Sequence, residues 1–384
     1  MGFNFRRRKI SSAGRPFTSS RAGRITLHLL RLLAGSVFVF SGFVKAVDPL
    51  GTVYKISDYL DAFGGFGPQL AVLAYPAAFL LIVFELMLGI QLMLMLRFRS
   101  STLLALVFMV AMTGLTLYIA VYNPVTDCGC FGDALKVSNW QTFYKNIVLL
   151  TIVVLLVVWR DKFKSFFLKP VEYCIGGVFL AAIIAFMVYN LLHLPVLDFR
   201  PYKIGVNIPE AMSVPEGAPA DEYNYSFVYQ KEGVKQTFSL DALPDSTWTF
   251  VEQKSELVRK GYEAPITNFT ILNADYQDVG HEILAYRGRT YLVVMYDLTR
   301  TSVRGLETIT EALAARTDGR VAGVTASNPA EVEAFKSAHK VKFPVYTADP
   351  VFLKTMIRAN PGVVVIENGT ITDKRNWRDS DKIQ

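Results

Sequence analysis

The sequence predicts an α-helical membrane bundle followed by an α/β domain, and three observations support this fold class. First, 52% of the 384 residues are hydrophobic, including 27 Phe, which is too apolar for an ordinary water-soluble domain. Second, five windows are long and apolar enough to cross a bilayer at about 1.5 Å of rise per helical residue. These windows are residues 25–47, 70–96, 101–122, 142–159 and 171–193. Third, residues 196–384 contain no comparable apolar run and alternate between strand-like and helix-like segments.

Basic residues are concentrated on one set of loops, which predicts the orientation of the spans. Lys and Arg beside spans stay on the cytoplasmic side of a membrane. The segments predicted to face inward hold thirteen of them, namely Arg6, Arg7, Arg8, Lys9, Arg15, Arg21, Arg24, Arg97, Arg99, Arg160, Lys162, Lys164 and Lys169. The predicted outer loops hold only Lys55 and Lys136. We therefore predict a multi-pass protein of the bacterial inner membrane, with residues 1–24 cytoplasmic and residues after 196 periplasmic.

Charge and hydropathy also argue against two simpler interpretations of the N-terminal region. The net charge of +7 follows from loops that flank the spans, so we expect a lipid bilayer and no nucleic acid as the partner of these basic residues. The first apolar window is longer than the usual core of a signal peptide, lacks a small-residue cleavage pattern and runs directly into further spans. We therefore expect it to be a signal-anchor.

Two charged side chains are singled out inside the predicted spans, Arg31 in the first and Glu85 in the second. A lone charge inside a bilayer is costly, so each needs a partner or a wet cavity. Antiparallel packing would place the two at comparable depth, and Gly35, Gly42 and Gly89 permit close approach of the helices. Two hypotheses stay open: a structural ion pair between Arg31 and Glu85, or a polar pocket that binds a quinone head group or carries protons.

Three further residues lie near span ends. Lys45 and Asp48 end the first span close to the predicted outer surface, where they can snorkel to the interface. Alternatively, they border the cysteine loop described below and favour a thiolate there. Cys174 lies near the inner end of the fifth span, a membrane thickness away from the other two cysteines, so we expect it to be buried and inert.

A short polar loop, Asp127-Cys128-Gly129-Cys130-Phe131-Gly132-Asp133, separates the third and fourth spans. Its two cysteines are close enough to form a disulfide in a small ring, on the face that we predict to be oxidising. Three roles stay open for the pair: redox exchange, a structural clip of the loop, and metal binding. Zinc usually takes four ligands, and His28, His193, His281 and His339 all lie elsewhere in the sequence.

These motifs resemble the DoxX family of membrane proteins, in particular its MauE-like branch, over about residues 25–160. The resemblance rests on Arg31 to Gly35, on Ser41 to Lys45 with Asp48-Pro49, on Glu85 to Gly89, and on the cysteine loop. It implies a four-helix membrane bundle with a redox-linked role. DoxX relatives accompany thiosulfate:quinone oxidoreduction, and MauE relatives are linked to disulfide-dependent maturation of a periplasmic dehydrogenase. The outline also fits quinone-linked thiol oxidases, but their Cys-x-x-Cys pair is absent. No residue here specifies a substrate.

The second half divides into a Pro- and Gly-rich connector with a β-hairpin, residues 196–263, and an alternating β and α region, residues 264–384. The hairpin is predicted at Tyr225–Gln230 and Val234–Leu240. The later segments are Tyr291–Tyr296, Leu306–Ala315, Val321–Thr325, a helix from Asn328-Pro329, Phe343–Tyr346, a helix from Asp349-Pro350, and a terminal hairpin at Val363–Ile366 and Thr370–Ile371.

This element order resembles a thioredoxin-like domain, and Pro361 stands where that fold usually carries a cis-proline. The Cys-x-x-Cys expected after Tyr291–Tyr296 is missing, because no cysteine follows Cys174. The domain therefore cannot exchange thiols by itself, and we expect it to hold a client near the cysteine loop. A lid or spacer without a ligand is the alternative.

The sequence thus favours a redox accessory protein, with a four-helix membrane domain over residues 25–160 and a fifth helix within residues 161–195. Cys128 and Cys130 would exchange a disulfide with an envelope protein client, possible quinone chemistry would use Glu85, Arg31 and Lys45, and no metal is assigned. The alternative is a non-enzymatic membrane anchor that assembles with an envelope protein complex. A transporter fits less well, because the spans are few and no internal repeat is evident.

Overall fold

The computed structural model describes residues 21–383, except residues 63, 65–67, 126, 164 and 260. The predictions made for Arg6, Arg7, Arg8, Lys9, Arg15 and Lys164 therefore lie outside the described residues. The chain divides into two compact units, Met1–Arg200 and Pro201–Gln384. We call them the membrane unit and the C-terminal unit and describe each by itself.

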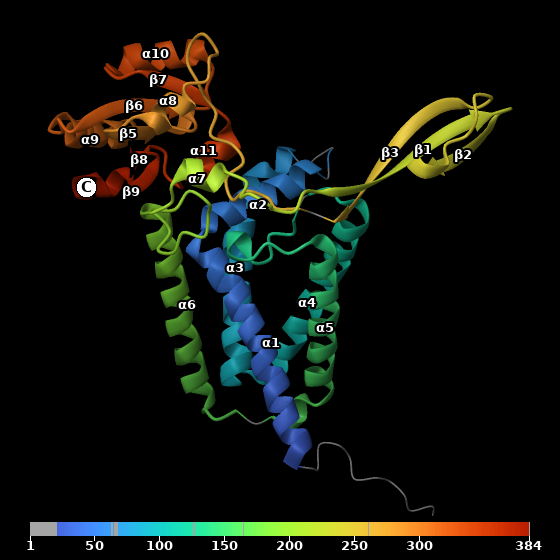
Figure 1. Cartoon of the computed structure of the whole chain (residues 1–384). Coiled ribbons are helices and arrows are strands. Elements are labelled where there is room, and N and C mark those ends of the chain that lie inside the picture. The colour runs from blue at the N-terminus through green and yellow to red at the C-terminus, as the bar shows by residue number, and fades with distance from the viewer. Residues whose placement is uncertain are drawn as a thin grey trace, which may run out of the picture. The chain divides into compact units, whose positions relative to one another are not determined.

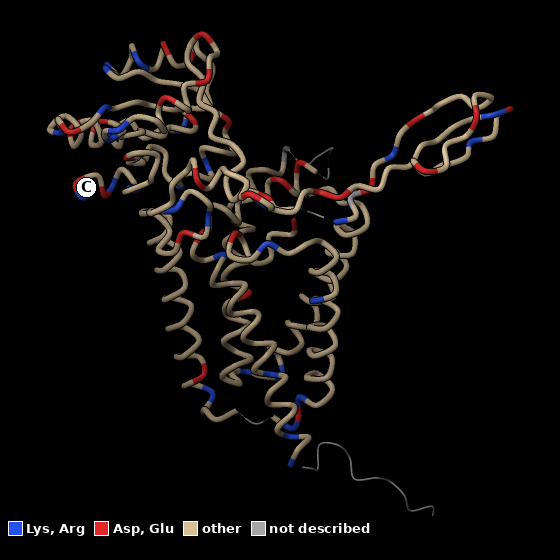
Figure 2. The backbone as a smooth tube through the Cα atoms, in the orientation of Figure 1, with Lys and Arg blue, Asp and Glu red and all other residues tan. Residues whose placement is uncertain are grey.

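The membrane unit is helical, and five of its described helices are long and apolar enough to cross a membrane. They are α1 (Arg21–Val47), α3 (Ala74–Leu94, extended backwards by the 3-10 turn Pro68–Leu73), α4 (Phe98–Tyr122), α5 (Asn139–Val158) and α6 (Lys169–Leu192). All five predicted spans are confirmed as helices, with ends that differ by a few residues. Figure 1 shows them running side by side, and Figure 2 shows that charged residues are sparse along their length.

One helix of this unit was not predicted. The helix α2 (Pro49–Ala62) follows α1 almost without a break, and Asp48 caps it by accepting a hydrogen bond from Gly51 N at 2.9 Å. Its composition is mixed, so a search for apolar windows passes over it. Val53 packs with Ala74 and Ala78, which holds α2 against the start of α3.

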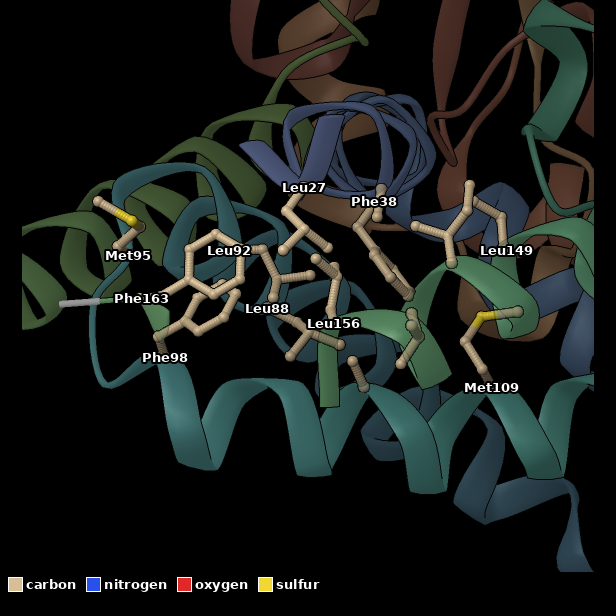
Figure 3. Packing of buried hydrophobic residues seen from close by; sticks show 14 residues of the cluster. Leu27, Phe38, Leu88, Leu92, Met95, Phe98, Met109, Leu149, Leu156 and Phe163 are labelled. Carbon is tan, nitrogen blue, oxygen red and sulfur yellow. The ribbon is translucent and has the colours of Figure 1, made fainter. Parts of the chain in front are cut away.

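The core of the membrane unit lies between α1, α3, α4 and α5. Figure 3 shows this cluster of interlocking apolar side chains, which includes Leu27, Phe38, Leu88, Leu92, Met109, Leu149 and Leu156. At one end of it the rings of Phe98 and Phe163 lie 4.3 Å apart. The short connection from α5 to α6 is therefore held by the same core.

Glycines set the register between α1 and α3. A side chain at Gly89 would lie 2.7 Å from the backbone nitrogen of Val39 and 2.9 Å from the carbonyl oxygen of Gly35. A side chain at Gly42 would similarly meet Leu86. The two backbones thus approach too closely for any Cβ at these positions, as small residues allow in membrane helix pairs.

The C-terminal unit contains two sheets. The first has the strand order β2-β1-β3 and is antiparallel, with β1 (Glu222–Lys231), β2 (Val234–Ser239) and β3 (Thr249–Arg259). The predicted hairpin is confirmed as β1 and β2. The third strand was not predicted, because its alternation is interrupted by a register shift where β3 pairs with β1.

The second sheet has six strands in the order β4-β7-β6-β5-β8-β9. The strands are β4 (Ile271–Leu272), β5 (Arg289–Val294), β6 (Gly319–Thr325), β7 (Val345–Ala348), β8 (Gly362–Glu367) and β9 (Thr370–Asn376). β5, β6 and β7 are parallel, whereas β8, β9 and β4 pair antiparallel with their neighbours. The Asn360–Pro361 peptide bond, just before β8, is cis.

Helices accompany this sheet, and most of them begin at a capping side chain. They are α7 (Ile208–Met212), α8 (Gly280–Ala285), α9 (Val303–Ala314), α10 (Pro329–His339) and α11 (Pro350–Met356). Asn328 and Glu331 form a capping box at α10, and Asp349 caps α11. The apolar face of α9, with Leu306, Ile309 and Leu313, packs on Tyr291 and Val293 of the sheet. Helices α7 and α8 and the short strand β4 were not predicted.

The substitution Gly89→Ala tests the close contact of α1 with α3. We expect a loss of about 1–3 kcal/mol of unfolding free energy, because the added methyl group meets backbone atoms that cannot turn away. Thermal unfolding of the full chain in detergent measures this loss. Gly114→Ala in α4 is the matched control, since a Cβ there meets no described atom within 4 Å and alanine favours helix. Equal melting temperatures for the two variants would contradict the proposed contact.

Candidate functional site

The candidate site is the loop between α4 and α5, with its 3-10 turn Gly132–Ala134. Cys128 and Cys130 form a disulfide and both are half-buried. Gly129 has φ +62° and its missing side chain makes room for Lys55, whose Cγ would lie 2.8 Å from a Cβ. Only glycine combines this backbone conformation with such a close neighbour. Glycine between the two cysteines is therefore required by the shape of the loop.

The carbonyl oxygen of Cys130 is held from below by α1. It accepts hydrogen bonds from Ser41 Oγ at 2.8 Å and from Lys45 Nζ at 2.9 Å. The same ammonium group forms an ion pair with Glu85 Oε2 of α3 at 2.7 Å. That oxygen lies 3.0 Å from Ser41 Oγ, so the single hydroxyl proton of Ser41 is shared between Glu85 and the Cys130 carbonyl. Ser41, Lys45 and Glu85 are all buried. A single network thus connects α1, α3 and the cysteine loop.

The carbonyl oxygen of Cys128 is held by α2. It accepts a hydrogen bond from the Tyr59 hydroxyl at 2.6 Å. Lys55, one turn earlier on α2, forms an ion pair with Asp127 at 3.1 Å, and Asp127 also accepts a hydrogen bond from Gly129 N at 2.8 Å. Burial, reinforced by Asp127 and Asp58, raises the pKa of Tyr59 above its usual value, so its hydroxyl remains a donor at neutral pH.

The third support of the loop comes from Phe131 and α5. Phe131 is buried, and its ring lies 5.4 Å from that of Phe40 on α1. The ammonium group of Lys145, in the second turn of α5, stands over the Phe131 ring at 4.4 Å from its centroid. At the start of α5, Asn139 Nδ2 donates to the carbonyl oxygen of Val125 at 3.0 Å. Helices α1, α2, α3 and α5 therefore all contribute to positioning the two cysteines.

Of the alternatives left open for the charged residues, the structure contradicts two. Arg31 and Glu85 do not pair: Arg31 donates to the carbonyl oxygens of Leu92 and Met93 at the end of α3. The glycine contacts fix an α1–α3 register that sets Glu85 opposite Gly42, so Lys45 is its partner. Lys45 does not snorkel either, because this network buries its ammonium group, and of the two alternatives the structure supports the contact with the cysteine loop.

Arg31 is remote from the loop. It precedes Lys45 by fourteen residues on the same helix, which corresponds to about 21 Å. Its cationic group at the C-terminus of α3 neutralises unpaired carbonyls of that helix, which is a structural role. The proposed pocket residues Glu85 and Lys45 are brought together, and Arg31 is not.

The expectation that Cys174 is buried is also wrong. Cys174 is a free cysteine and its side chain is exposed on α6. Only a small part of α6 is covered by the rest of the unit, since buried positions are confined to Glu172, Ile183, Met187 and Asn190. Cys174 therefore faces away from the bundle. The apolar side chains of α6 are suited to contact with lipid rather than with a protein core.

Sequence reasoning missed three residues of the site. Tyr59 and Lys55 lie on the helix that was not predicted, so nothing connected them with the loop. Lys145 lies within the window of residues 142–159 and was overlooked as a charge inside a span. Its presence in an otherwise apolar helix was the available signal. Among the described residues, no group of three His, Cys, Asp or Glu side chains is arranged as metal ligands would be.

Together, the fold and the loop define a multi-pass membrane protein with a disulfide at one end of its helical bundle. Residues 23–160 match the family described as methylamine utilisation protein MauE, so the chain contains a MauE family domain. Residues 223–260, which span the three-stranded sheet, match a domain family of unknown function. No curated protein and no solved structure matches the chain.

The substitution Lys45→Met tests the buried ion pair. We expect a loss of about 3–5 kcal/mol in unfolding free energy, because Glu85 would keep a buried charge without its counterion. The double variant Lys45→Met/Glu85→Leu should lose much less than the sum of the single variants. Lys55→Met is the control, as its pair with Asp127 is partly exposed and contributes about 0–1 kcal/mol. Thermal unfolding in detergent compares the wild type with Lys45→Met, Glu85→Leu, the double variant and Lys55→Met. A smaller effect for Lys45→Met than for Lys55→Met would refute this assignment.

The substitution Tyr59→Phe tests the hydrogen bond on Cys128. Its loss removes about 0.5–1.5 kcal/mol of anchoring, so reduction of the loop disulfide by a soluble phosphine should be roughly two- to tenfold faster. The raised pKa of Tyr59 means that the hydrogen bond is complete below about pH 10 and is lost only as the pH rises further. The rate difference should therefore be constant across the neutral range. The exposed Tyr144→Phe serves as control, and a rate equal to that control would count against the anchor.

Proposed function

We propose that this protein is a redox accessory protein of the bacterial inner membrane that exchanges the Cys128–Cys130 disulfide with thiols of an envelope protein client. The observation that carries the proposal is the half-buried disulfide in a loop whose backbone is fixed from several helices. The polar anchors act on the main-chain carbonyls of the two cysteines, so the loop can keep its place while the sulfur bond changes.

The atoms and electrons of this exchange balance between the client and the loop, without any other reagent. A client thiolate attacks one sulfur of the pair, the Cys128–Cys130 bond breaks, and the other sulfur leaves as a thiolate. A second client thiolate then attacks the mixed disulfide and releases the protein. Two electrons pass from the client to the loop, and protons lost by the client thiols are taken up by the loop thiolates.

Reoxidation of the loop requires an electron acceptor, and we propose a membrane quinone. The buried polar group of Ser41, Lys45 and Glu85 lies directly below the loop and offers hydrogen-bond donors to a quinone oxygen. These residues already satisfy one another, so a quinone would have to compete for the Lys45 or Ser41 donors. The MauE family domain supports an accessory role, as its description refers to methylamine utilisation.

For the C-terminal unit we propose a thioredoxin-like fold that docks the client. The strand order β6-β5-β8-β9, with β5 and β6 parallel and the other two antiparallel, supports this fold. The unit contains no cysteine, so it cannot share in the exchange. Holding a client close to the loop would raise its effective concentration there.

The second candidate function is a non-enzymatic anchor that assembles with an envelope complex. The absence of thiols from the C-terminal unit favours it. The two candidates differ in their dependence on the disulfide. An anchor tolerates loss of both cysteines, whereas an exchange protein does not.

Replacing cysteines distinguishes these functions. In reconstituted bilayers, the wild-type chain should oxidise a dithiol peptide, and Cys128→Ser/Cys130→Ser should lose this activity entirely because no sulfur remains to be attacked. Either single variant keeps one loop thiol, which should attack the disulfide form of the same peptide, release one peptide thiol and trap a mixed disulfide that mass spectrometry detects. Cys174→Ser is the control and should behave as wild type, since its side chain lies on a separate helix face.

The same cysteines report the orientation. After reduction, an impermeant maleimide added to intact cells should label Cys128 and Cys130 if they face the periplasm. Retention of activity in the double serine variant would rule out the exchange function. Protection from the maleimide in intact cells, together with labelling after lysis, would show that the proposed orientation is reversed.

A further inference from the structure

Lys145 is a positively charged residue on the face of α5 that is turned toward the other helices of the bundle. It is the seventh residue of this helix, which sets it about 9 Å below the helix start. Its neighbours Thr142 and Asn146 are buried, whereas Trp140 and Tyr144 are exposed. Lys145 itself is half-buried, so it lies on the bundle side of the helix.

No carboxylate of the described residues forms an ion pair with this ammonium group. Glu85 is an acidic residue that acts on this charge, and its carboxylate is already held by Lys45 and Ser41. What Lys145 contacts instead is the face of the Phe131 ring. A cation–π contact is weaker than the cost of a half-buried charge beside a second lysine. The two ammonium groups of Lys45 and Lys145 thus face the single carboxylate of Glu85, which leaves one positive charge without a counterion.

A negative charge appears in the cysteine loop when the disulfide opens. Phe131, under Lys145, directly follows Cys130, and the other ammonium group, that of Lys45, donates to the Cys130 carbonyl. The Cys128 side of the loop lies instead beside Tyr59 and Asp127. Both ammonium groups are therefore on the Cys130 side.

We propose that Lys145 is a positioning residue that stabilises the thiolate of Cys130, so that Cys128 is the sulfur attacked by the client and Cys130 is the sulfur that leaves. This inference rests on the proposed exchange function and assigns its direction. The client thiolate forms a bond to Cys128 Sγ, the Sγ–Sγ bond breaks, and the electron pair of that bond remains on Cys130 Sγ. The positive charge of Lys145 then has its counterion.

Other charged and titratable groups act on the same loop. Lys45 of α1 and Glu85 of α3 largely compensate each other, as do Lys55 of α2 and Asp127. Tyr59 remains neutral at neutral pH, and Asp133 is exposed at the loop surface. Lys145 is the group of this set whose charge is left for the thiolate.

The test measures the thiol pKa of Cys130 in the full-length Cys128→Ser variant, from the pH dependence of its alkylation rate in nanodiscs. Adding Lys145→Gln should raise this pKa by roughly one unit, since an opposite charge nearby is removed. Lys145→Arg should retain the original value, because the positive charge is kept. Lys136→Gln, which removes an exposed lysine close by in the sequence, is the matched control and should change nothing.

The direction of attack has its own measurement. The probe is a peptide that carries a disulfide. At neutral pH, the lone Cys130 of Cys128→Ser should be deprotonated to a larger extent than the lone Cys128 of Cys130→Ser, and it should therefore react faster with the probe. Adding Lys145→Gln should slow the reaction of Cys130 several-fold and leave that of Cys128 unchanged. An unchanged Cys130 pKa in Lys145→Gln overturns the inference, as does an equal change at Cys128. Exchange activity that survives Cys128→Ser/Cys130→Ser overturns the proposed function instead, and this outcome is independent of the thiol pKa.

Discussion

The ion pair between Lys45 and Glu85 is the interaction on which the candidate site depends. Two charges removed from water are unfavourable unless they are paired and their remaining hydrogen bonds are made. Here Ser41 and the carbonyl oxygen of Cys130 complete the set. The cysteine loop thus helps to satisfy a buried charge, and the buried charge holds the loop. Neither can move far without leaving a polar group unsatisfied in an apolar surrounding.

The pair exists because α1 and α3 approach closely. Gly35, Gly42 and Gly89 bring the two backbones together, and the resulting register puts Glu85 within reach of Lys45 rather than of Arg31. The choice of Lys45 as the partner of Glu85 is therefore a consequence of helix packing. The same register leaves Arg31 to bind the carbonyl oxygens at the end of α3. In this membrane unit, the small residues bring the helices together, and this close approach allows the buried charges to pair.

The two units differ in their sulfur chemistry and in their architecture. The membrane unit carries the disulfide and its supporting charges, whereas the C-terminal unit has no cysteine and two sheets. Its three-stranded sheet coincides with a domain family of its own, residues 223–260. Several aromatic side chains of that sheet, including Tyr229, Phe238 and Phe250, pack on one another rather than on a deep core. The sheet is thus a small module with its own side-chain cluster.

The sequence by itself determined the secondary structure wherever one local rule dominates. Apolar length fixed the five membrane helices, capping residues such as Asn328 and Asp349 fixed where helices begin, and Asn368-Gly369 fixed the last turn, with φ of +50° and +75°. It also singled out Cys128, Cys130, Glu85 and Lys45. Only the tertiary structure decided which of these residues meet. Pairing of Lys45 with Glu85, and the arrival of Tyr59 and Lys145 at the loop, depend on helix register and on contacts between segments distant in sequence. No periodicity in a single segment encodes such contacts, because they arise when four helices pack together.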